Sequence, residues 1–170
     1  NIVCRDIDFG RPGQIDGAQG RTRLGLFVGG GVVDGLLVEN IKFADPDTAA
    51  IAGLDLAGGT VSNLVVRNVS VTDTEWETEF FAVGVRQTGG SLVNARIEGS
   101  TNNTARSGKK GFAGFVSTGG TARNVLVNGC RTLSSDNDLA GAGLRLAGGT
   151  VVNATVAGNA ASGVAFAGLS

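Results

Sequence analysis

Apolar and polar residues alternate along much of the chain, in short runs that recur at a regular interval. Pairs of adjacent glycines mark the recurrence and lie 28 to 31 residues apart, ending at Gly31, Gly59, Gly90, Gly120 and Gly149. The nine residues after each pair align without a gap, as in VVDGLLVEN and TVSNLVVRN. Within each copy every second position is apolar and often β-branched, which is typical of strands with one buried face.

Each copy predicts three short strands. The first begins at a Gly-Leu type pair such as Gly53-Leu54, the second follows the glycine pair, and the third lies in a more variable stretch such as 68–71. A column of Asn, Asp or Gly separates the second strand from the third: Asp6, Asn40, Asn68, Gly99, Gly129 and Gly158. These residue types tolerate a left-handed backbone, so the column predicts a turn in every copy.

We therefore expect residues 1–170 to form one all-β segment, a parallel β-helix solenoid. It should have about 30 residues per rung, about six rungs and three short strands per rung, and right-handed winding is favoured for parallel crossovers. Both Asn1 and Ser170 fall in the middle of a rung. We expect flanking rungs of a longer chain, or other copies stacked end to end, to cover the open strand edges.

The repeat resembles the GLUG motif family and, more loosely, the pectate-lyase-like parallel β-helix proteins. The resemblance is carried by the pattern Gly-Leu-x-x-x-Gly-Gly-Thr-Val-x-Asn-x-x-Val, which runs from Gly53 to Val66 and again from Gly143 to Val156. It covers nearly the whole chain. It implies a large secreted or surface protein, often an adhesin, in which the repeats have a structural role.

Composition narrows the possible chemistry. The chain has no His and only two Cys, which excludes Ser-His-Asp triads, His-ligated metals and cysteine zinc sites, so no cofactor is expected. A net charge of −1 argues against nucleic acid as a partner. No apolar run approaches the roughly 18 residues of a membrane span. Cys4 and Cys130 fall in rungs roughly 19 Å apart, too far for a disulfide.

Two columns predict side-chain ladders along the solenoid. One is a structural ladder of stacked amides, interrupted at Gly35 and formed by Asn1, Asn63, Asn94, Asn124 and Asn153. A polar binding face is the alternative interpretation of this column. The other is a charge ladder of alternating sign, Arg5, Glu39, Arg67 and Glu98, which we expect to fix register more than stability. Asp8 with Lys42, and Asp55 with Arg86, are expected as further pairs.

Two longer insertions fall at the same corner of neighbouring rungs. One carries Glu75, Trp76 and Glu77, and the other carries Arg106, Lys109 and Lys110. Their opposite charges predict that the loops pair with each other. The alternative is a contact site, in which Trp76 stacks on a sugar ring or anchors a protein partner. The sequon that begins at Asn102 predicts a possible glycosylation site in a loop.

These patterns favour a structural or adhesive solenoid, extracellular or at the cell surface, with no chemistry of its own. Such a segment would serve as a stalk, adhesin or filament building block, with a glycan or a surface protein as a possible partner. The alternative is a polysaccharide lyase or hydrolase of the pectin-lyase-like type, or a carbohydrate-binding solenoid. Catalysis would need paired carboxylates, and the candidates Asp45 with Asp47 and Asp136 with Asp138 have no stacked acidic partner in the next rung.

Overall fold

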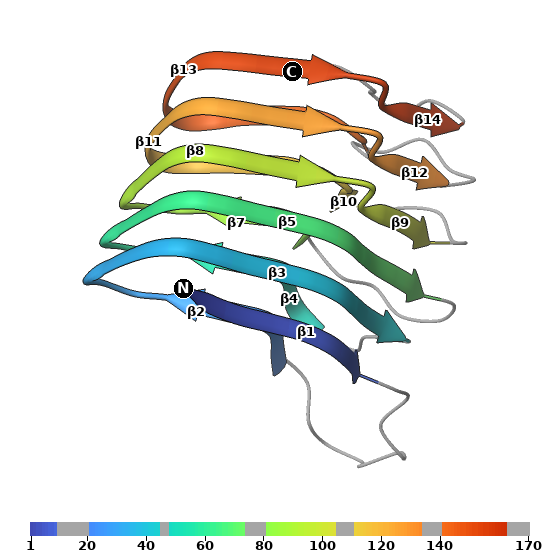
Figure 1. The fold of residues 1–170 in the computed structure, drawn as a ribbon. Helices are drawn as coiled ribbons and strands as arrows, with labels where there is room; N and C mark the ends of the chain where they lie inside the picture. Colours follow the sequence, from blue (N-terminus) through green and yellow to red (C-terminus); the bar gives the residue numbers. More distant parts are fainter. Residues whose placement is uncertain (10–20, 45–47, 74–80, 105–110, 134–140, 163–170) are drawn as a thin grey trace.

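The computed structural model describes residues 1–9, 21–44, 48–73, 81–104, 111–133 and 141–162. Over these residues all regular structure is β-strand, and every strand pairing is parallel. The strands lie one above another and wind into a solenoid (Figure 1). The expected all-β parallel β-helix is confirmed.

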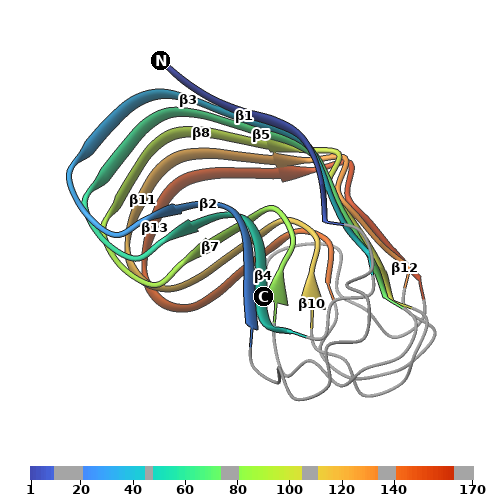
Figure 2. The same ribbon diagram turned by 90° about the horizontal axis from the view of Figure 1, so that it is seen from below.

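One wall of the solenoid is a sheet of six stacked strands among the described residues. In order along the axis these are β1 (Ile2–Phe9), β3 (Val32–Ala44), β5 (Thr60–Asp73), β8 (Ser91–Glu98), β11 (Phe115–Asn128) and β13 (Leu144–Ala157). The facing wall contains β2 (Arg21–Val28), β4 (Thr48–Leu56) and β7 (Val85–Gln87). Figure 2 shows both walls end-on, with β11 and β13 passing around the bend that joins them.

Three shorter strands and one small strand pair complete the described rungs. The ends of the long strands are continued by β9 (Thr101–Thr104), β12 (Arg131–Leu133) and β14 (Ala160–Ser162). A separate two-stranded sheet is formed by β6 (Phe81–Ala82) and β10 (Gly111–Phe112). Both loop insertions predicted from the sequence, 73–79 and 104–110, lie almost wholly outside the described residues.

The strand register follows the aligned repeat. Leu36, Leu64, Ala95 and Val125 pair in turn across β3, β5, β8 and β11. Each of these side chains is at most 2% exposed, so they form a continuous apolar column between the walls. A shift of one residue would move the whole set to the solvent face, and their burial is therefore what holds the register.

The backbone bends at two columns of left-handed residues. Every described non-glycine residue with positive φ is Asn or Asp, with φ between 53° and 57°. One set, Asp6, Asn40 and Asn68, lies in the column predicted to be left-handed, and Gly99, Gly129 and Gly158 continue it. The other set is the Asn ladder from Asn63 to Asn153, which the sequence had indicated only as a hydrogen-bonding column.

The three-strand rung requires two corrections. In β11 and β13 the first and second predicted strands form one strand that runs through the glycine pair. Both β3 and β5 run without a break through Asn40 and Asn68, so in those rungs the second and third predicted strands are one bent strand. Separate strands occur only where glycine stands at the bend, as at Gly99 between β8 and β9. An Asn in the left-handed region can keep its strand pairing while its side chain bonds to the next rung.

Both cysteines are free thiols, as the rung alignment predicted. Cys4 packs against the core and its Sγ lies 3.3 Å from the Gly25 carbonyl oxygen. Cys130 is fully buried, and this burial raises the pKa of its thiol to about 11. Thiolate chemistry at neutral pH is therefore disfavoured at Cys130.

Candidate functional site

The predicted Asn ladder is present. The amide nitrogens of Asn94, Asn124 and Asn153 donate to the amide oxygen of the Asn in the preceding rung, at 3.2, 2.9 and 3.1 Å. Asn63 Nδ2 donates to Asp34 Oδ1 at 2.7 Å, so the ladder ends on this aspartate, next to the glycine at position 35. A Cβ added to Gly35 would meet Asn1 Oδ1, so Asn1 lies beside that glycine. The predicted structural ladder is thus confirmed from Asn63 to Asn153, whereas no hydrogen bond joins Asn1 to it among the described residues.

A second ladder follows the other left-handed column. Asn40 Nδ2 donates to Asp6 Oδ1 at 2.9 Å, and Asn68 Nδ2 donates to Asn40 Oδ1 at 3.3 Å. The series stops at Gly99, which has no side chain. These residues were expected only to form turns, although a column of Asp, Asn and Asn was the available signal for a ladder.

Both ladders end in an aspartate on their N-terminal side. All amide donors point toward the preceding rung, so the first position has only to accept a bond, and an ionised carboxylate does this without leaving a donor unpaired. Asp34 accepts bonds from Ser62 Oγ at 2.6 Å and from Asn63. These hydrogen bonds, led by that from Ser62, lower the pKa of Asp34 below its ordinary value of 3.8.

The charge ladder is confirmed for three of its four members. Glu39 is only 7% exposed and lies between two arginines, with Arg67 Nη2 at 2.6 Å and Arg5 Nη1 at 3.9 Å. Glu98 is the exception, because its Oε1 pairs with Arg96 Nη2 of the same strand at 2.8 Å. Glu98 is still the register neighbour of Arg67, but that guanidinium is already bonded twice to Glu39.

The two further predicted pairs differ in outcome. Arg86 donates to Asp55 from Nε to Oδ1 at 3.0 Å and from Nη2 to Oδ2 at 2.6 Å, and Asp55 is 2% exposed. Asp8 and Lys42 are register neighbours, but no ion pair joins them among the described residues. Both side chains are exposed and lie in a groove instead.

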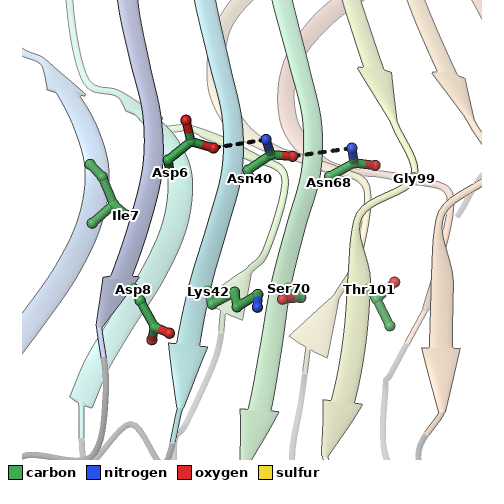
Figure 3. Close-up of a pocket in the computed structure, with 9 residues that line it drawn as sticks. All are labelled: Asp6, Ile7, Asp8, Asn40, Lys42, Asn68, Ser70, Gly99 and Thr101. Atoms are coloured by element: carbon green, nitrogen blue, oxygen red, sulfur yellow. Dashed lines mark hydrogen bonds between the residues drawn. The ribbon is translucent and has the colours of Figure 1, made fainter.

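This groove crosses several rungs and has a volume of about 580 Å³. Its floor follows the outward column of Asp8, Lys42, Ser70 and Thr101, and one side follows the second amide ladder (Figure 3). Carboxylates, an ammonium group, hydroxyls and amides are thus placed along one line. The described residues hold no cluster of three or more His, Cys, Asp or Glu side chains that could ligate a metal.

One predicted site residue is misplaced. Asn102 was expected in a loop, accessible for glycosylation, but it lies on β9 with its side chain inside the solenoid and is 0% exposed. Its register neighbours are Val71 and Thr132, both buried. An attached glycan could not be accommodated there, so the expectation is corrected.

The predicted contact loop cannot be placed. Glu75, Trp76, Glu77, Arg106, Lys109 and Lys110 all lie outside the described residues. The same holds for the carboxylate candidates Asp45, Asp47, Asp136 and Asp138.

No family model, curated protein or solved structure matches the chain. The likeness to GLUG-type repeats therefore stays a prediction from the residues quoted above. In the part of the chain that the structure describes, there is no helix capable of crossing a lipid bilayer.

Proposed function

We propose that this chain is a structural and adhesive segment of an extracellular or cell-surface β-solenoid, a building block of a stalk, adhesin or filament. The observation that carries the proposal is the pair of amide ladders, in which the side chains of two columns form hydrogen bonds between rungs. Side chains committed in this way stiffen a stack along its axis and are not available for chemistry.

The two ends of the stack support rung-on-rung association as its mode of assembly. Among the described residues, β1 pairs only with β3 and β13 pairs only with β11. Ile2 and Val3 on β1 are 46% and 56% exposed, and Val152 on β13 is 40% exposed. Open parallel edges with apolar side chains bind further strands readily. We infer that like rungs, either flanking in a longer chain or from another copy, cover these edges.

Sedimentation velocity over a range of protein concentrations tests this association. Ala154 belongs to the inward column of the last described rung and is exposed there, so Ala154→Lys places a charge at the open end of the core. Such inward charges block edge pairing in natural sheets. The matched control is Thr155→Lys, one residue along β13 and facing outward. We expect Ala154→Lys to reduce self-association and Thr155→Lys to leave it unchanged. A wild-type chain that stays monomeric at every concentration would refute the proposal.

A further inference from the structure

The groove beside the second amide ladder contains polar groups that the fold itself does not use. Among the described residues, the Lys42 ammonium and the Ser70 and Thr101 hydroxyls form no hydrogen bond or ion pair with protein. Figure 3 shows Lys42 extending along the groove toward Ser70, with Asp8 on its other side. Asp6 is engaged through both carboxylate oxygens, since Oδ1 accepts the Asn40 amide and Oδ2 lies 3.7 Å from Arg5 Nε.

These groups are repeated at the spacing of the rungs. Asp8, Lys42, Ser70 and Thr101 are successive register neighbours across β1, β3, β5 and β9, so neighbouring Cα positions differ by about 4.8 Å along the axis. A ligand in the groove would therefore lie across the strands and parallel to the solenoid axis. It would meet one polar side chain per rung, which suits a linear polymer with hydrogen-bonding groups in every unit.

The surroundings disfavour an extended peptide that lies along the groove. Both β3 and β5, which form the middle of the groove, are paired on each side, so strand addition is open only at the edge of β1, at one end of the groove. Ile7 is the only large apolar side chain of the lining, and it is partly buried. A peptide lying across the strands would find neither a backbone partner in the middle of the groove nor an apolar pocket for an anchor residue.

The charges do not favour a polyanion. The lining has two carboxylates, Asp6 and Asp8, and one ammonium, Lys42, and Arg5 pairs with Asp6 at 3.7 Å. The groove therefore has no excess of positive charge, whereas binding of a nucleic acid or another polyanion needs several cations in a row. An uncharged polyhydroxylated ligand needs no such row, because carboxylates accept bonds from hydroxyl groups while ammonium and hydroxyl groups donate to ring and hydroxyl oxygens.

We propose that this groove binds a neutral linear glycan along the solenoid axis, with Asp8, Lys42, Ser70 and Thr101 as its hydrogen-bonding residues. Asp8 accepts hydroxyl protons from one sugar, Lys42 donates to the next, and Ser70 and Thr101 bind the following units. This proposal deepens the adhesive part of the proposed function by naming a ligand class.

The test is titration of the wild-type chain with soluble xylan, glucan and mannan oligosaccharides, followed by ligand-observed NMR and calorimetry. We expect at least one neutral glycan to bind, with little dependence on salt because the ligand is uncharged. Lys42→Gln and Asp8→Asn should each weaken that binding by about tenfold or more, the usual effect of removing a charge-assisted hydrogen bond. Both side chains are exposed, so thermal unfolding of the variants should match wild type.

The matched control is Arg123→Gln, which removes one exposed charge from β11 outside the groove. It should leave glycan affinity unchanged. The proposal is overturned if no neutral glycan binds, if a polyuronate binds better, or if the Arg123 variant loses as much affinity as the Lys42 variant. Sedimentation of the same samples reports stacking separately. If the wild-type chain self-associates but binds no neutral glycan, only the groove proposal is refuted. If it binds a neutral glycan but does not self-associate, the structural proposal is refuted.

Discussion

The rungs around β3 and β5 differ from those around β8 and β11 at the same bend. In the first pair, Asn40 and Asn68 hold the bend, bond to each other, and leave the strand continuous. In the second pair Gly99 and Gly129 hold it, no side-chain bond links them, and the strand breaks in two. The backbone has the same left-handed φ in both. The side chain at the bend, not the bend itself, decides whether the strand continues.

The interior next to this bend changes at the same place. One inward column has Phe43 and Val71 in the early rungs, then Asn102 and Thr132 in the later ones. All four are buried, but both amide atoms of Asn102 lack a hydrogen-bond partner. Asn159 in the later rungs is satisfied, since its Oδ1 accepts the Cys130 amide at 2.9 Å and its Nδ2 donates to the Val127 carbonyl at 3.1 Å. The alternation of apolar and polar positions therefore fixes the register in all these rungs, while the identity of the inward residues sets the stability of each rung.

The largest expected effect concerns the early rungs, whose inward column is apolar (the apolar half). Phe43→Ala removes a ring that is 1% exposed, and we expect the free energy of unfolding to fall by about 3–5 kcal/mol. Phe27 is 56% exposed, so Phe27→Ala is the control and should change stability by less than about 0.5 kcal/mol. Chemical denaturation measures both. Equal losses would mean that the early interior does not dominate stability.

The later rungs, whose inward column contains Asn102 and Thr132 (the polar half), should gain stability when a polar side chain is replaced by an apolar one. Asn102→Val restores the residue type of Val71 and removes two unsatisfied buried amide atoms, so we expect a gain of about 1–3 kcal/mol. The reciprocal change, Val71→Asn, should lower stability by a similar amount. A loss of stability in Asn102→Val would show that the amide is satisfied, for example by an ordered water, and would weaken the contrast between the two halves.

The sequence could predict the register of these rungs but not all of their side-chain contacts. Leu36, Leu64 and Ala95 align because alternation and burial leave one choice of face. Glu98 was assigned to Arg67 because they share a column, but Arg96 lies two residues away on the same face of the same strand and the Arg67 guanidinium was already occupied. Column alignment indicates which residues are neighbours, and it does not decide between two neighbours of the same charge.

The candidate site shows the same limit. Ladder positions followed from one repeated residue type, so Asn63, Asn94 and the residues aligned with them were found. The groove was missed because Asp8, Lys42 and Ser70 share no residue type and become a site only when the bend makes their face concave. Asn102 was expected in a loop because it begins a sequon, whereas its register with Val71 places its side chain inside the solenoid.

A single ladder residue separates hydrogen bonding from backbone strain. Asn94 has φ of 55°, donates to Asn63 and accepts from Asn124. Asn94→Gly keeps the left-handed backbone and loses both bonds, for about 1 kcal/mol. Asn94→Ala also places a Cβ in that region, which should cost about another 1 kcal/mol. Equal stability of the two variants in urea denaturation would exclude the backbone contribution.

The contrast at the bend can be tested by extending the short ladder. Gly99 has φ of 62°, and a Cβ there would lie 3.1 Å from Asn68 Oδ1, close enough for an introduced amide to reach it after a small adjustment. Gly99→Asn should raise stability by roughly 0.5–1 kcal/mol through one new ladder bond and a less flexible unfolded chain. Gly99→Ala is the control and should lower it, since alanine gains no bond in the left-handed region. Amide hydrogen exchange of Ser100 and Thr101 should slow only in the Asn variant.

The smallest effect concerns the acid that ends the longer ladder. Hydrogen bonds from Ser62 and then Asn63 lower the pKa of Asp34 in the folded chain below 3.8. A depressed folded-state pKa means that the stabilisation is present above the unfolded value and is lost as pH falls through the folded value, so the loss lies below pH 3.8. Asp34 is exposed, and we expect only a slight change in unfolding temperature there. Carboxyl-detected NMR titration should show the Asp34 pKa rising in Ser62→Ala but not in the control Ser91→Ala, which lies one rung further along. An unchanged pKa in Ser62→Ala would mean that this hydroxyl does not hold the ladder end.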